Sequence, residues 1–166
     1  MARKCLRDPP LSPLLSRIAD ATADPASGTV FASTMTQADG YTVSIYTWYA
    51  VTGALERVGT LQDAGSRTRH RPLAYIPASR ACPAAHLVVG ACNDPTLDIF
   101  ELPSLRHVCA AAAPLGPSAR IYGLAGDPSG GALVINDAES GAVRVVAWPL
   151  REMAEQAPTA APIATN

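Results

Sequence analysis

The sequence repeats a segment of itself, and this constrains the fold more than any other feature of the chain. Residues 16–31 align without a gap with residues 119–134, and the two copies lie 103 residues apart. That separation equals two units of about 51 residues, and a weaker middle copy begins at Arg71. The identical positions are Arg17 with Arg120, Ile18 with Ile121, Asp24-Pro25 with Asp127-Pro128, and Gly28 with Gly131.

Each unit continues with short segments of β type. Residues 41–51 alternate in polarity, which is the period of a strand with one buried face. Thr52-Gly53 makes a turn and residues 54–61 return. One face of the first strand is expected to carry Val43, Ile45, Tyr49 and Val51, and the other Ser44, Tyr46 and Trp48. The corresponding hairpins are predicted at 96–102 with 105–109, and at 132–136 with 142–148.

This succession of hairpins predicts an all-β fold of antiparallel, β-propeller-type blades, in about three units of about 50 residues. A β-sandwich is the second candidate, since it shares short strands and turns but lacks the self-similarity. The 15 prolines and the period-two segments exclude a helical repeat.

The predicted organisation is an N-terminal extension over 1–13, a partial propeller over 14–150, and a short helix or disordered tail over 151–166. The blades are expected at about 14–62, 71–113 and 118–150. Two local choices stay open. Ser12-Pro13 followed by Leu14, Leu15, Ile18 and Ala19 fits a short helix, although the repeat favours a strand over residues 17–23. Residues 150–157 fit two helical turns.

The residues over about 14–150 resemble the WD-repeat family of β-propellers. The Asp-Pro-x-x-Gly turn after the first strand carries this resemblance, together with the third strands around Ile45 and Ile99. Trp48 is followed by Tyr49 and Trp148 by Pro149, so the Trp-Asp dipeptide of the family is absent and the match is to a divergent propeller. The resemblance implies a scaffold that contacts other proteins.

Three blades are fewer than the four to eight with which propellers close. They leave open sheet edges and an uncovered apolar wall. We therefore expect a fragment, a truncated form, or a chain that completes its propeller by self-association.

Composition narrows the function classes further. Thirteen basic and 14 acidic side chains give a net charge of −1, which offers no field for nucleic acid or an anionic membrane. No apolar stretch approaches the length of a membrane helix. The four cysteines, Cys5, Cys82, Cys92 and Cys109, are too sparse for a disulfide scaffold and match no zinc module, which favours a reducing compartment. The predicted localisation is cytoplasmic, with the nucleus as the alternative.

The polar residues offer few candidates for chemistry. Cys82, His86, Cys92, His107 and Cys109 contain metal-ligand types, with His107 and Cys109 expected on one face of a strand. Metal sites need ligands that converge, and core or edge positions explain these residues better. Asp24 and Asp127 form a carboxylate pair of the kind that glycosidases use, but Asp before Pro is typical of a turn. Nucleophile-elbow, Walker, dinucleotide-binding and zinc-protease motifs are absent from the sequence. We therefore assign no catalytic, cofactor-binding or metal residue.

Two surface features remain. The basic cluster of residues 67–71 lies in a loop between units and is expected to be solvated, with a phosphate or acidic-peptide contact as the functional alternative. Tyr46, Trp48 and Tyr49 are expected to be buried between blades, with a binding hot spot as the alternative.

The sequence thus predicts a non-catalytic, WD-repeat-like scaffold that binds other proteins and needs no cofactor. The alternatives are a propeller-type hydrolase whose site needs blades not present here, and a small β-sandwich with an unknown ligand.

Overall fold

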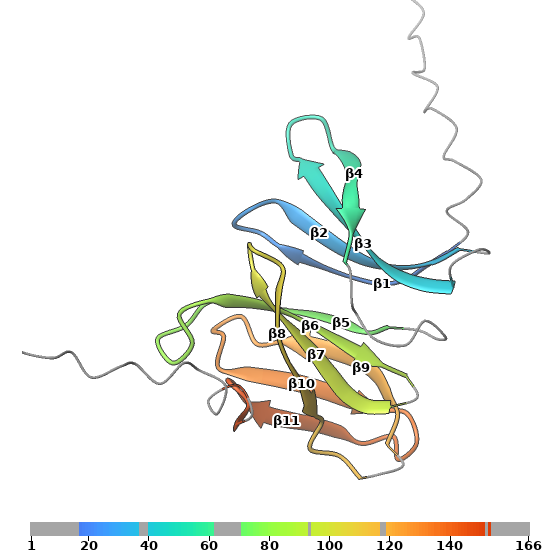
Figure 1. The fold of residues 1–166 in the computed structure, drawn as a ribbon, viewed down its shortest axis with the longest axis vertical. Helices are drawn as coiled ribbons and strands as arrows, with labels where there is room; N and C mark the ends of the chain where they lie inside the picture. Colours follow the sequence, from blue (N-terminus) through green and yellow to red (C-terminus); the bar gives the residue numbers. More distant parts are fainter. Residues whose placement is uncertain are drawn as a thin grey trace, which may run out of the picture.

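Three antiparallel sheets, stacked in chain order, make up the protein (Figure 1). The computed structural model describes residues 17–36, 40–61, 71–92, 94–116, 119–151 and 153. The first sheet contains β1 (Arg17–Asp24), β2 (Thr29–Thr36), β3 (Gly40–Tyr49) and β4 (Ala54–Thr60). The second contains β5 (Leu73–Ile76), β6 (Ala85–Ala91), β7 (Asp94–Leu102) and β8 (Arg106–Ala112). The third contains β9 (Ile121–Gly126), β10 (Ala132–Asp137) and β11 (Val143–Ala147).

Each sheet is a meander, because every strand pairs with its neighbour in the sequence. The all-β prediction is therefore confirmed. β1 is a strand, as the repeat predicted, and it pairs antiparallel with β2 from Arg17 to Asp24, with one shift of register between Ile18 and Asp20. The division into blades at the predicted boundaries stays a prediction. Arg151 and Met153 are helical, while most of the predicted helix and tail lies outside the described residues.

The first two sheets share an irregularity that the sequence did not reveal. The pairing of β3 with β4 shifts between Ile45 and Tyr46, and the pairing of β7 with β8 shifts between Ile99 and Phe100. In each case the strand on the outside carries one extra residue, which is a β-bulge. The repeat therefore extends to the register of the strands.

The apolar core lies between the sheets and forms two clusters. One cluster joins the first sheet to the second and includes Phe31, Ile45 and Phe100. The other joins the second sheet to the third and includes Ile99 and Leu133. Both faces of the second sheet are therefore buried, while each outer sheet has one face that no further sheet of the described chain covers.

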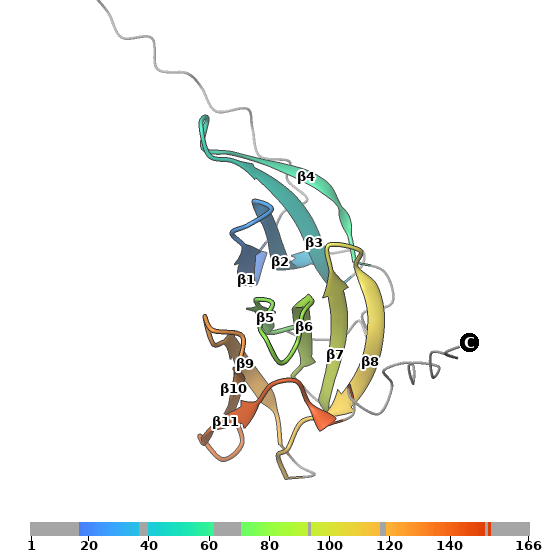
Figure 2. The same ribbon diagram turned by 90° about the vertical axis from the view of Figure 1, so that its left-hand side faces the viewer.

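β1, β5 and β9, the first strands of the three sheets, lie one after another along one side of the molecule (Figure 2). β9 approaches β5 closely, because a Cβ on Gly126 would meet the carbonyl oxygen of Tyr75 at 2.0 Å. Only glycine allows this spacing. No helix in the described part of the chain has the length and apolar character to cross a membrane.

Candidate binding cavity at the inner strands

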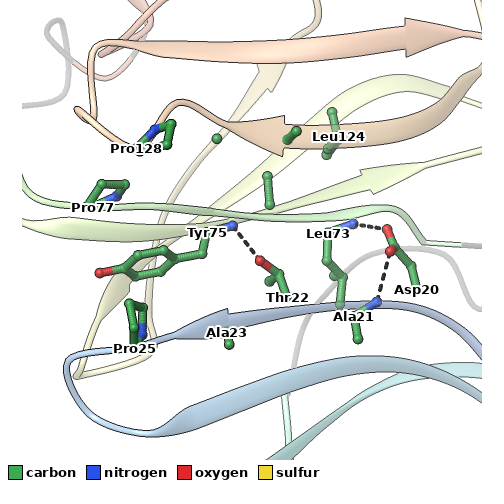
Figure 3. Close-up of a pocket in the computed structure, with 13 residues that line it drawn as sticks. Asp20, Ala21, Thr22, Ala23, Pro25, Leu73, Tyr75, Pro77, Leu124 and Pro128 are labelled. Atoms are coloured by element: carbon green, nitrogen blue, oxygen red, sulfur yellow. Dashed lines mark hydrogen bonds between the residues drawn. The ribbon is translucent and has the colours of Figure 1, made fainter.

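A cavity of about 520 Å³ lies between β1, β5 and β9, which are the first strands of the three sheets and are called the inner strands below (Figure 3). Its walls are mostly apolar, with a few polar groups contributed by β1 and β5. The residues that line it are Asp20, Ala21, Thr22, Ala23, Pro25, Leu73, Ala74, Tyr75, Pro77, Leu124, Ala125, Gly126 and Pro128. Such a volume and lining suit a ligand group or a partner's side chain.

Side chains of β1 satisfy the free edge of β5. Asp20 Oδ2 accepts a hydrogen bond from the N–H of Leu73 at 2.8 Å, and Thr22 Oγ1 accepts one from the N–H of Tyr75 at 3.1 Å. Asp20 Oδ1 also accepts from the N–H of Ala21 at 2.8 Å. The three bonds are drawn in Figure 3. Both oxygens of this carboxylate are thus occupied by main-chain donors, which is a structural role rather than acid–base chemistry.

Tyr75 connects the cavity to the turn between β1 and β2. Burial raises the pKa of Tyr75, and its hydrogen bond to the Asp24 carboxylate raises it further. Burial acts to raise the pKa of Asp24, but hydrogen bonds from Ser27, Ala26 and Tyr75 outweigh that effect, so the pKa lies below its usual 3.8. The carboxylate and the phenol therefore keep their ordinary charge states at neutral pH.

Three prolines stand at one end of the cavity, one after each inner strand. They are Pro25, Pro77 and Pro128, and Figure 3 shows them above one another. Strand register makes Pro25 and Pro77 equivalent. Pro25 follows Asp24, which pairs with Thr29, and Pro77 follows Ile76, which pairs with His86 at the same position of the second sheet. The sequence comparison matched Pro25 with Pro128 and placed Pro77 in the turn of the weaker middle copy, which has Ile76 where the other two copies have aspartate. The prolines form a rigid, apolar rim.

The predicted turn role of Asp24 and Asp127 is confirmed by their hydrogen bonds. Asp24 accepts from Ala26 N at 3.0 Å and from Ser27 Oγ at 2.7 Å. Asp127 accepts from the N–H and the hydroxyl of Ser129.

The two turns have the same length but different main-chain conformations. Asp24 pairs with Thr29, and the N–H of Asp127 donates to the carbonyl oxygen of Ala132, so each turn joins residues five apart. The positive φ falls at Gly28 in the first turn but at Gly130 in the second, although the sequence alignment matches Gly28 with Gly131. The repeat therefore fixes where each turn lies but not which of its residues is left-handed.

Asp137 holds a third turn of this kind. The sequence placed a turn over residues 137–141 but did not single out the side chain of Asp137. This side chain accepts hydrogen bonds from Ser140 Oγ at 2.6 Å, from Arg120 N at 2.9 Å and from Glu139 N at 3.0 Å. The bonds from Ser140 and Arg120 lower its pKa to about 2. The signal was available, because residues 24–28 and 137–141 share the spacing Asp-x-x-Ser-Gly.

The structure brings together only two of the five candidate metal ligands. Cys82 Sγ lies 3.7 Å from His86 Nδ1, and the His86 ring packs edge-on against Trp148 at 5.6 Å. Burial raises the pKa of the Cys82 thiol and lowers the pKa of His86, so both groups are neutral at pH 7. Among the described residues, no group of three His, Cys, Asp or Glu side chains is placed to hold a metal ion.

The expectation that His107 and Cys109 share one face of a strand is wrong. Cys109 pairs with Ile99 and is buried, whereas His107 pairs with Phe100 and is exposed. Ile99 and Phe100 are adjacent and point to opposite faces of the sheet. The bulge adds one residue between His107 and Cys109, and that residue reverses the alternation.

Two expectations about surface residues are also wrong. Arg71 is buried rather than solvated, and burial lowers its pKa, against the opposing effect of the charge on Asp98. Residues 67–70 of the basic cluster lie outside the described residues. Trp48 and Tyr49 are 49% and 46% exposed, because no further sheet of the described residues covers their end of the first sheet. Tyr46 is half-buried.

No protein-family model matches the chain, and no curated protein matches it. Among solved structures, the chain is similar to the β-propeller domain of Cps50 (Swd1) from Myceliophteria thermophila. The two share 14% sequence identity with a TM-score of 0.57, over 76% of this chain. The match spans 39% of that structure's chain. The predicted resemblance is thus confirmed for the fold: this chain is folded as part of a β-propeller.

Proposed function

We propose that the chain is a non-catalytic, WD-repeat-like scaffold that binds other proteins. The observation that carries the proposal is the use of polar side chains at the inner strands. Asp20 and Thr22 hold the edge of β5, while Asp24 and Asp127 hold turns. These side chains serve the main chain, which favours a rigid binding surface over a reaction centre.

The cavity at the inner strands is the proposed contact site. Its apolar walls and the rim of Pro25, Pro77 and Pro128 suit an apolar side chain from a partner's loop. A rigid proline rim loses little conformational freedom when a partner docks, so more of the contact energy is retained as affinity. The thiols of Cys82 and Cys92, which form no disulfide, fit the cytoplasm, with the nucleus as the alternative.

A propeller-type hydrolase is the alternative, with its site supplied by blades outside this chain. Self-association that completes the propeller is also part of the proposal.

The test is affinity purification with the purified chain, followed by reconstitution with each captured protein and calorimetry. Pro128→Arg alters the cavity rim, and Pro114→Arg is the matched control, because Pro114 is exposed and lies away from the cavity. We expect Pro128→Arg to weaken binding at least tenfold and Pro114→Arg to leave it unchanged. Equal binding by both variants would remove the cavity from the proposal. A chain that binds no protein but hydrolyses ester, glycoside or phosphoester substrates would favour the hydrolase.

A further inference from the structure

The three sheets carry apolar residues at equivalent positions on the face that points to the following sheet. Equivalence follows from register, because Phe31 pairs with Ile45, Val88 with Ile99, and Val134 with Val145. The third strand of each sheet also carries an apolar residue two positions before the one just named. These residues are Val43, Leu97 and Val143. The three sets are Phe31, Val43 and Ile45; Val88, Leu97 and Ile99; and Val134, Val143 and Val145.

Burial of these sets depends on whether a sheet follows. The second sheet covers the first set and the third sheet covers the second set, and no member of either is more than 7% exposed. In the third sheet, Val143 is 65% exposed and Val145 is 70% exposed. Its outward face therefore has the composition of a covered face but lacks a cover from the described chain.

On the opposite face of each sheet, which points to the preceding sheet, burial likewise depends on whether a preceding sheet is present. The N–H of Trp48 donates to Gly28 O at 2.9 Å, and the N–H of Trp148 donates to Gly131 O at 2.9 Å, so the two tryptophans are equivalent. Trp148 packs against the second sheet and is 4% exposed. Trp48 is 49% exposed, because the described residues form no sheet before the first one on which it could pack. Leu102 takes this position in the second sheet and is 8% exposed.

The two open faces are thus the two halves of an interface that the chain already makes twice internally. We infer that a second copy of this chain docks head to tail, with the Val143–Val145 face of one copy on the Trp48 face of the other. The inference rests on the scaffold function proposed above and specifies its self-association. Two copies that meet in this way at both ends give six sheets. Closed propellers have four to eight such sheets, or blades. Each copy then presents both of its faces to the other, so the closed pair has two-fold symmetry and leaves neither face open.

Light scattering coupled to size exclusion tests this inference over a wide range of protein concentrations. The expected species has twice the 17.2 kDa mass of the chain. Val145→Asp and Trp48→Arg should each yield a monomer, since either change places a charge in both interfaces. Val51→Asp is the matched control, because Val51 is fully exposed in the turn between β3 and β4 and lies on neither face. Circular dichroism checks that each variant is folded.

Mixing the two monomeric variants separates a head-to-tail contact from other arrangements. In the mixture, one interface keeps Val145 opposite Trp48, and the other places the introduced aspartate of one copy near the introduced arginine of its partner. The dimer should therefore return. A folded wild-type monomer, an open-ended polymer, or a dimer that survives Trp48→Arg would each overturn the inference. None of these results removes the proposed scaffold function, which fails only if the chain captures no partner protein.

Discussion

Replacement of Gly126 by alanine provides the sharpest test of how the sheets pack. The new Cβ would lie 2.0 Å from the carbonyl oxygen of Tyr75 and 3.1 Å from Cγ1 of Ile76. The main chain of β5 cannot give way easily, because Tyr75 and Ile76 pair with Leu87 and His86 of β6. β9 and β5 must therefore separate by about an ångström to restore an ordinary contact, which loosens the core between the second and third sheets.

The expected cost follows from overpacking, which destabilises a tightly packed site by about 1–3 kcal/mol and occasionally more. We expect about 3 kcal/mol for Gly126→Ala, because the contact is with main chain rather than a movable side chain. Alanine at an unstrained glycine position instead stabilises by about 0.4–1 kcal/mol through the unfolded state. Gly123→Ala is the matched control on β9, since its Cβ would meet only Asn136 Cβ at 3.7 Å.

Urea unfolding measures the difference, with far-UV circular dichroism and tryptophan fluorescence followed on the same samples. Coincident transitions are required before free energies are compared. The unfolding midpoint of Gly126→Ala should fall well below that of the wild type, and that of Gly123→Ala should not. Equal midpoints for the two variants would refute the close approach of β9 to β5.

Three further outcomes are expected. Thr22→Val should lower the free energy of unfolding by about 1–2 kcal/mol, because the N–H of Tyr75 loses its acceptor. Urea unfolding measures this difference, and an unchanged free energy would mean that water replaces the hydroxyl. The burial of His86 lowers its pKa in the folded state, so the unfolded state binds more protons and stability should fall as pH decreases below 6.5. Thermal unfolding across this range should show a weaker pH dependence for His86→Asn than for the wild type. An identical dependence in the two proteins would contradict the assignment. Asp137 has a folded pKa of about 2 against a usual 3.8, so its contribution to stability is complete above pH 3.8 and is lost as pH falls towards 2. Asp137→Asn should remove that part of the acid transition. An unchanged dependence of stability on pH would count against the hydrogen-bonded turn.

Much of the fold was predictable because its signals are local. Period-two alternation placed the strand around Ile45, and Asp-Pro followed by glycine placed the turns after β1 and β9. The internal repeat then favoured successive hairpins over a single sandwich. The same logic applies to Asp137, whose Asp-x-x-Ser-Gly spacing was present but unused.

Only the tertiary structure decided which faces are covered and where the cavity lies. Val145 and Ile99 occupy equivalent strand positions, yet one is 70% exposed and the other is fully buried. The bulge that separates His107 from Cys109 leaves no mark in local polarity, and Arg71 lies in a basic segment that looks solvated.

The cavity depends on the relative placement of three strands that are about fifty residues apart in the chain, so no segment by itself encodes it. Local sequence determines strand, turn and period, because these depend on neighbouring residues. Burial and cavities depend on which sheet packs against which, and that is settled only when the whole chain has folded.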